Sequence, residues 1–147
     1  MRNHISRIAN HVYVKSGLKA VQAYQDAFRL EVEGEPQLDD KGVLIYQELR
    51  LNGQLFMSVS DAEFLEIAGE HPHGIRPTML NIIYFVIEED LRRAFELLYK
   101  EGNPCTGLRA GEIKEHDVAS CDVVFIDKFG VHWHLCVLLD WKSPLIP

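Results

Sequence analysis

Two amphipathic helix patterns organise the hydrophobic positions of this chain. In the first, Val21, Tyr24 and Phe28 recur at the spacing that places them on one face of a helix over Leu18–Leu30. The second pattern predicts a helix over Glu89–Lys100, with an apolar face formed by Leu91, Ala94, Phe95 and Leu98. Adding 70 to the positions of the first stripe gives three residues of the second, which indicates an internal duplication.

Strand patterns surround both helices. Short apolar runs at His11–Val14 and Leu80–Val86 precede them. After the first helix, Val43–Leu51 alternates in polarity, Asn52-Gly53 is a hairpin signal, and Leu55–Ser60 forms the returning strand. After the second helix, two further strands flank the turn Asp127–Gly130, at Cys121–Ile126 and Val131–Leu139.

These elements predict an α+β fold made of two βαβββ modules. We expect the modules at residues 8–61 and 78–139, joined by a linker at 62–77 that is rich in Gly and Pro, within a single domain of residues 1–147. The segment 102–120 of the second module is predicted to be a long polar loop. Such loops often cover a binding site, and the alternative is a loop that is simply mobile.

The composition and charge of the chain argue against some classes of binding partner. Of the 147 residues, 47% are hydrophobic and 25% charged, which is ordinary for a globular protein. A net charge of -7 without a basic run argues against binding to nucleic acid. The longest apolar stretch is too short to span a membrane, and no signal peptide is visible. The three cysteines form no CxxC pair and are odd in number, so we expect a reduced, cytoplasmic protein.

Two hairpin motifs resemble those of a known family. The stretch from Asp127 to Trp133, DKFGVHW, resembles the DKFGVxW signature of PhnB-like proteins. The stretches Glu48–Gly53 and Ser60–Ala62 are similar to the E-L-x-I-x-G and S-D-A motifs of the same proteins. The resemblance extends roughly from Ala9 to Val137 and points to the PhnB-like branch of the vicinal-oxygen-chelate superfamily, which includes glyoxalases, bleomycin-resistance proteins and dioxygenases.

The resemblance implies a curved mixed sheet whose concave face forms a cup, and a homodimer. In metal-dependent members, four side chains facing the cup bind a divalent cation. The corresponding positions here are Ala9, Asn81, Met57 or Ser58, and His134. Only His134 is a usual ligand of such ions, so the complete metal site of the family is not expected.

The histidines offer a different metal set. His132 and His134 lie two residues apart on one strand and should share a face, with Trp133 on the other. With His11 from the first strand, they could bind Zn, Ni or Fe through imidazoles. The alternative is that these histidines line the cup and form hydrogen bonds to a ligand, water or neighbouring residues.

Further residues are candidates for the cup itself. Glu48 could act as a general base if an apolar environment raises its pKa, although a Glu that alternates with apolar residues is more often simply solvated. Six residues are candidates for the wall of the substrate cavity: Tyr13, Tyr46, Phe56, Asn81, Ile83 and Phe85.

Three functions fit these features. The first is a protein that binds a small organic molecule in the cup without the complete metal site. The second is a metal-dependent lyase, isomerase or dioxygenase that uses the histidines. The third is an interaction protein in which the cup has no ligand. A fold of this kind supports many activities, so the sequence does not identify a substrate.

Overall fold

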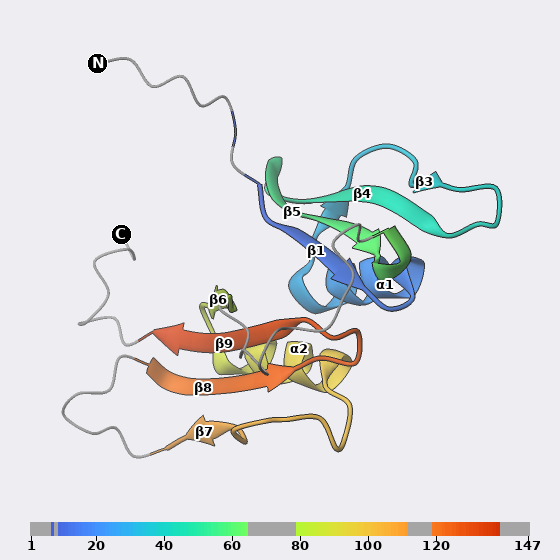
Figure 1. Ribbon diagram of the computed structural model, residues 1–147. Coiled ribbons are helices and arrows are strands. Elements are labelled where there is room, and N and C mark those ends of the chain that lie inside the picture. The colour runs from blue at the N-terminus through green and yellow to red at the C-terminus, as the bar shows by residue number, and fades with distance from the viewer. Residues whose placement is uncertain (1–6, 8, 65–78, 112–118, 139–147) are drawn as a thin grey trace, which may run out of the picture. The chain divides into compact units, whose positions relative to one another are not determined.

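The computed structural model describes residues 7, 9–64, 79–111 and 119–138, and the chain divides into two compact units, Met1–Ala68 and Gly69–Pro147. The boundary falls within the predicted linker, of which only residues 62–64 are described. Each unit contains one sheet and one α-helix (Figure 1). Among the described residues, no helix is both long enough and apolar enough to cross a lipid bilayer.

The first unit contains a mixed five-stranded sheet in which the outer strand β1 is parallel to β5. The strand order is β1-β5-β4-β2, and β3 also pairs with β4. Its elements are β1 (His11–Val14), α1 (Gly17–Phe28), β2 (Glu31–Val32), β3 (Gln37–Leu38), β4 (Leu44–Leu51), β5 (Gln54–Asp61) and the 3-10 helix η1 (Ala62–Phe64).

The second unit repeats this plan with a four-stranded sheet of order β6-β9-β8-β7, in which β6 is parallel to β9. Its elements are β6 (Asn81–Phe85), α2 (Glu88–Leu98), β7 (Arg109–Ala110), β8 (Ala119–Ile126) and β9 (His132–Leu138). The prediction of an α+β fold with two βαβββ modules is confirmed, and both helices lie within two residues of their predicted ends. The cup concerns both units together and stays a prediction.

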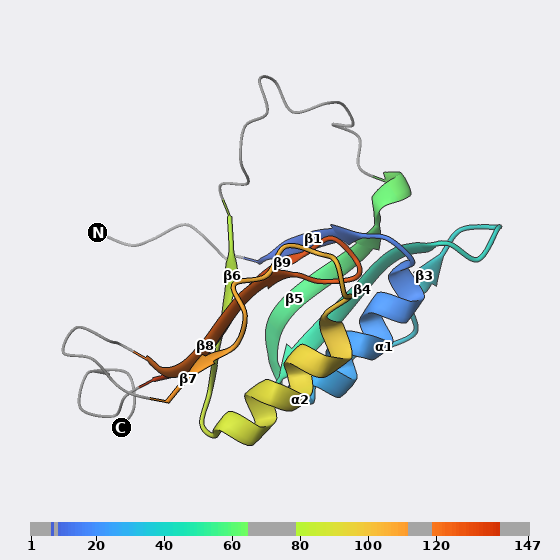
Figure 2. The same cartoon turned by 90° about the horizontal axis from the view of Figure 1, so that it is seen from below.

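Each helix covers one face of the sheet in its own unit, as Figure 2 shows for α1 and α2. The buried side chains of the first unit include Val12, Val14, Tyr24, Leu49, Met57 and Val59. Those of the second include Leu91, Ala94, Leu98, Val123, Phe125, Trp133 and Leu135. The opposite face of each sheet is here called the open face. Among the described residues it carries no helix of its own unit, and it holds most of the candidate site residues.

The start of α1 depends on a glycine. A Cβ atom at Gly17 would lie only 2.8 Å from the Cβ of Leu44, a distance that side chains essentially never adopt. The backbone N–H of Gly17 donates to Asp61 Oδ2 at 3.1 Å, so the last residue of β5 satisfies one of the free donors at the helix N-terminus. The helix therefore begins directly against the sheet.

Turn geometry fixes both hairpins. Asn52 and Gly53 have φ angles of 51° and 80°, so the Asn-Gly hairpin turn is confirmed. In the second hairpin, the buried carboxylate of Asp127 accepts hydrogen bonds from the backbone N–H groups of Phe129 and Val131, at 2.8 and 2.9 Å. It also accepts one from the indole Nε1 of Trp133 at 2.8 Å. This carboxylate joins the turn to the core of the second unit.

We predict that Trp133→Ala lowers the free energy of unfolding by about 3–5 kcal/mol, because it removes a side chain that is 1% exposed and leaves a cavity. It also leaves Asp127 without one of its donors. Urea unfolding followed by circular dichroism measures the change. The matched control is Leu18→Ala, at a residue of α1 that is 45% exposed, where a change within about 0.5 kcal/mol is expected. Equal losses in both variants would contradict the packing described.

Candidate functional site

A row of polar side chains crosses the open face of the first sheet. In the strand register, His11 of β1 pairs with Ser58 of β5, and Ser58 pairs with Glu48 of β4. Residues paired in this way share a face, so the three side chains lie side by side. Their chain neighbours Val12 and Val59 point to the opposite face and are buried. The alternation predicted for His11 is therefore present.

Hydrogen bonds fix the tautomer of His11. Ser60 Oγ donates its only hydrogen to the carbonyl oxygen of Ile45 at 2.7 Å. It must therefore accept the hydrogen bond that joins it to His11 Nε2 at 2.7 Å. In the neutral ring, Nδ1 is then unprotonated and accepts from Ser58 Oγ at 2.6 Å. Burial lowers the pKa of His11 from 6.5, which favours this neutral form.

Two tyrosine rings lie beside this imidazole. The ring of Tyr46 is stacked with that of His11, with centroids 5.9 Å apart, and the ring of Tyr13 meets it edge-on at 4.8 Å. Tyr13 is 40% exposed. The three rings form an aromatic surface on the open face, and both predicted tyrosines of the cavity wall belong to it.

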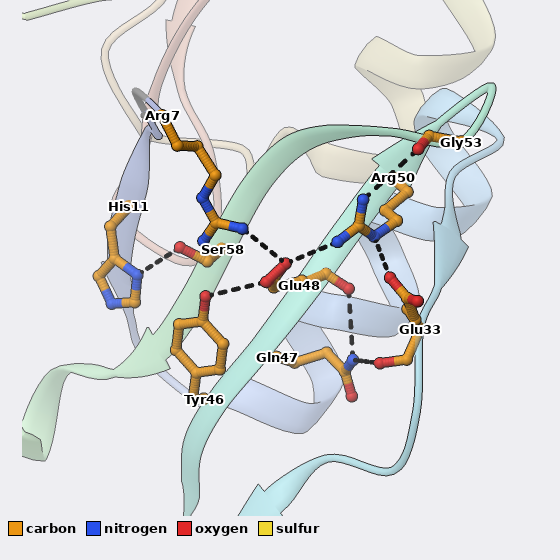
Figure 3. Close-up of polar contacts among 9 residues, drawn as sticks. All are labelled: Arg7, His11, Glu33, Tyr46, Gln47, Glu48, Arg50, Gly53 and Ser58. Atoms are coloured by element: carbon orange, nitrogen blue, oxygen red, sulfur yellow. Dashed lines mark hydrogen bonds and ion pairs between the residues drawn. The ribbon is translucent and has the colours of Figure 1, made fainter. Parts of the chain in front are cut away.

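Glu48 is held by its neighbours rather than left free. Its carboxylate accepts hydrogen bonds from the Tyr46 hydroxyl at 3.2 Å and from Arg50 Nη2 at 2.9 Å. Arg7 Nη1 lies 3.5 Å away (Figure 3). Arg50 also forms an ion pair with Glu33. Glu48 therefore belongs to a network of two arginines and two glutamates, an arrangement more typical of fixed ion pairs than of a general base.

A cavity of about 310 Å³ opens beside Tyr46 and Glu48. Gln47 is one of its lining residues, and the side-chain amide of Gln47 donates to the carbonyl oxygens of Glu33 and Glu48, at 3.3 and 3.2 Å. Figure 3 shows these contacts around β4. The lining residues are Arg7, Glu33, Glu35, Gln37, Tyr46, Gln47, Glu48 and Arg50.

Phe56 lies apart from this surface. The pairing of β4 with β5 shifts register between Leu49 and Arg50, which leaves Phe56 as an extra residue in a β-bulge. Its ring is 6.0 Å from that of Phe28 on α1. This contact places Phe56 close to α1, and its assignment to the wall of the substrate cavity stays a prediction.

Three further cavity candidates lie on the covered face of the second sheet. Asn81, Ile83 and Phe85 of β6 pair with Trp133, Leu135 and Val137 of β9. They share the face of the buried Trp133, and Asn81 Nδ2 donates to the carbonyl oxygen of His132 at 3.2 Å. The assignment of these three residues to the wall of the substrate cavity stays a prediction.

The open face of the second sheet carries His132, His134 and Asp122. His134 Nε2 lies 2.9 Å from Asp122 Oδ2. Arg109 of β7 donates to both oxygens of the same carboxylate, at 3.1 and 2.8 Å. The sequence marked His132 and His134 as a pair, but the structure gives His134 a carboxylate partner from the neighbouring strand.

The donor set does not fit the metal site of the family. Ala9 has no donor atom, Asn81 lies on the covered face, and Ser58 is engaged with His11. Within the described residues, no three His, Cys, Asp or Glu side chains are close enough to share an ion. His11 belongs to the first unit, and both of its ring nitrogens already have serine partners. Burial raises the pKa of Cys136 to about 11, so its thiol is protonated at neutral pH.

Sequence reasoning missed Ser58, Ser60 and Asp122. The two serines alternate along β5, a pattern visible in the sequence. The alignment of Ser58 with Glu48 depends on the bulge, which the sequence does not reveal. Asp122 lies on the same strand as Val123 and Phe125, and its alternation with them could have placed it opposite the core.

The chain is similar in fold to several proteins of known structure. No family model matches the chain, and no curated protein matches it significantly. The PhnB protein of Bacillus cereus is 18% identical with a TM-score of 0.65, over 90% of this chain and 99% of that one.

Two other structures share the fold. A glyoxylase/bleomycin resistance protein/dioxygenase domain from Frankia sp. is 13% identical with a TM-score of 0.54, over 95% of this chain and 100% of that one. A FosX fosfomycin-resistance variant from Listeria monocytogenes, solved with Mn(II) and 1S,2S-dihydroxypropylphosphonic acid, is 13% identical with a TM-score of 0.56, over 94% of each chain. At these identities the likeness concerns the fold alone. The chain therefore has the glyoxalase/bleomycin-resistance fold.

Proposed function

We propose that this chain binds a small organic molecule on the open face of its first sheet, without the complete metal site of the family. The observation that carries the proposal is the ordered row His11–Ser58–Glu48. Ser58 and Ser60 are buried, with 2% and 4% of their surface exposed. Their hydroxyl groups form hydrogen bonds to the two ring nitrogens of His11 and hold the ring in a single tautomer. Such preorganisation is typical of a binding surface.

The size and chemistry of the cavity favour a small polar ligand with a planar group. A volume of about 310 Å³ is at the lower end of the range for sites that bind small molecules. The ring of Tyr46 lines the cavity and can pack against a planar group. Arg7, Arg50 and the glutamates of the wall offer hydrogen bonds to polar substituents.

The neighbours supply the alternative. The FosX structure contains Mn(II) and a small phosphonic acid, which makes a metal-dependent lyase, isomerase or dioxygenase the competing hypothesis. Here such an enzyme would need ligands beyond His134.

We also propose a cytoplasmic location. The three cysteines are free, as expected for a protein in a reducing compartment.

The binding proposal is tested with a library of small aromatic and planar polar compounds, followed by calorimetry on each hit. Tyr46→Ala should weaken binding at least tenfold, because it removes a ring surface and a lining residue together. Leu18→Ala, at an exposed residue of α1, is the matched control and should bind normally. If Tyr46→Ala binds every hit as tightly as the wild type, the proposed location is wrong.

Elemental analysis of untagged protein, purified without chelator, tests the alternative. A stoichiometric metal that is lost in His134→Ala would favour the metal enzyme.

The neutral state of His11 predicts a pH dependence of stability. Its pKa in the folded protein is lowered below 6.5 by burial, so the unfolded chain takes up a proton first as the pH falls. The contribution of His11 is thus fully present above about pH 6.5 and is lost as the pH falls towards the lowered folded pKa. In urea unfolding between pH 8 and pH 5, His11→Gln should lose stability less steeply than the wild type. Parallel curves would count against a buried neutral imidazole.

We also propose a homodimer. Strand β6 is an edge of the second sheet, and the segment around it exposes several apolar side chains, namely Met79, Leu80, Ile82, Tyr84, Val86 and Ile87. Exposed edges and apolar patches of this kind are commonly covered by another chain. Sedimentation equilibrium at micromolar concentration should give about twice the monomer mass of 16.8 kDa. A monomer mass under these conditions would refute the dimer.

A further inference from the structure

The cavity of the first unit lies where strand pairing along β4 is interrupted. Strands β2 and β3 both pair with β4, but the segment 33–36 between them forms no strand. Gly34 in this segment has a φ angle of 76°, and Pro36 has no backbone N–H to offer to a neighbouring strand. Gln47 and Glu48 of β4 therefore have no partner residue in either β2 or β3.

The side chain of Gln47 occupies this interruption, and the orientation of its amide is fixed. Nε2 donates to the carbonyl oxygens of Glu33 and Glu48, at 3.3 and 3.2 Å (Figure 3). The amide cannot be reversed, because Oε1 would then face two other acceptors. Oε1 therefore points away from both carbonyl groups.

This oxygen is an acceptor without a donor. None of the described residues donates a hydrogen bond to Gln47 Oε1. The residue is only 4% exposed, and it lines the cavity. A buried acceptor that lacks a hydrogen bond is costly, so the site favours a ligand that brings an N–H group to it.

The charges around the cavity favour a cation. Its wall contains three glutamates and two arginines, a net formal charge of -1. Both arginines are engaged, since Arg50 forms ion pairs with Glu48 and Glu33, and Arg7 lies beside Glu48. Glu35 is exposed and has no cationic partner among the described residues. An anionic ligand would have to compete with these ion pairs, whereas a cationic ligand would meet an unpaired carboxylate.

Tyr46 adds an aromatic ring to the wall of the cavity. The ring is held in place, because its hydroxyl donates to Glu48 at 3.2 Å and its plane is stacked with the His11 ring. A fixed aromatic ring attracts a cation over its face and packs against a planar group. It therefore suits a ligand that has both.

We propose that this cavity takes a small organic cation, made of a planar ring and an ammonium group that carries N–H hydrogens. One N–H of the ligand donates to Gln47 Oε1, the carboxylate of Glu35 balances the positive charge, and Tyr46 packs against the ring. This inference rests on the proposed binding function, to which it adds the charge and the donor group of the ligand. Binding is non-covalent and involves no proton transfer.

Four one-ring compounds separate these features. Benzylamine carries the ring, the charge and the N–H groups; benzyl alcohol lacks the charge; benzyltrimethylammonium keeps the charge but has no N–H; benzoate reverses the charge. Titrations of the full chain at pH 7 and low salt, followed by proton–nitrogen-15 NMR, measure each Kd and locate the site. Benzylamine should bind about tenfold more tightly than each of the others, with large shifts at Tyr46 and at the side-chain amide of Gln47.

Salt and charge variants test the electrostatic part. About 0.5 M NaCl should weaken the binding of benzylamine and leave that of benzyl alcohol unchanged. Glu35→Gln keeps the shape of an exposed side chain and should weaken benzylamine about fivefold, again without affecting benzyl alcohol. The matched control is Glu63→Gln, which removes the same charge from an exposed position of η1 outside the cavity wall. It should bind benzylamine as the wild type does.

The role of the amide oxygen has its own variant. Gln47→Leu should lose the preference for benzylamine over benzyltrimethylammonium, and circular dichroism checks that the variant is folded. If Gln47→Leu does not fold, the comparison of the two cations in the wild type still tests the same hydrogen bond.

Two results would overturn this inference: an affinity for any of the other three compounds that equals that for benzylamine, or an equal Kd for benzylamine in Glu35→Gln and the wild type. Benzyl alcohol or benzoate bound in preference, with binding lost in Tyr46→Ala, would overturn the cationic ligand and leave the proposed binding function standing. Absence of binding by all four compounds would overturn it as well, and the compound library would then decide separately on the binding function.

Discussion

The buried carboxylate of Asp127 is the interaction on which the second unit depends. It binds two backbone N–H groups of its own turn and the indole of Trp133, so one side chain fixes both the shape of the hairpin and the position of the largest core residue. A carboxylate that is 1% exposed is stable only when its oxygens are satisfied, and this one has three donors. Because Trp133 is thereby held under α2, the alternate residues His132 and His134 must face the other way.

The two units use the same plan for different chemistry. In the first, both nitrogens of His11 are bound by serines, so the imidazole is a fixed part of a surface. In the second, His134 is bound at one nitrogen only, and its partner is a carboxylate balanced by Arg109. The first arrangement fixes the ring at both nitrogens, and the second fixes it at Nε2. A duplicated fold allows this division because each sheet leaves one face without a helix of its own unit.

The chain has a net charge of -7, but the half-buried carboxylates of both open faces are paired with cationic side chains. Glu48 is matched by Arg50, with Arg7 nearby, and Asp122 is matched by Arg109 and His134. Each of these carboxylates is 16% exposed, so it would be costly without a partner. The arginines that appear scattered along the sequence are thus brought to individual carboxylates by strand pairing.

The sequence by itself determined the two modules, both helices and both hairpin turns. These follow from local rules: periodicity, the Asn-Gly pair and the turn with Asp127 at its start. It also determined the parity of β1 and β9, because His11 and His134 alternate with clearly apolar neighbours. Only the tertiary structure decided the faces of β5 and β6. In β6 every residue but Asn81 is apolar or aromatic, so alternation has no contrast, and only the pairing of Asn81 with Trp133 fixes its register. In β5 the bulge at Phe56 shifts the register by one residue, which is what brings Ser58 opposite Glu48. A shift of one residue exchanges the two faces of a strand, and it depends on contacts between strands that no local pattern records.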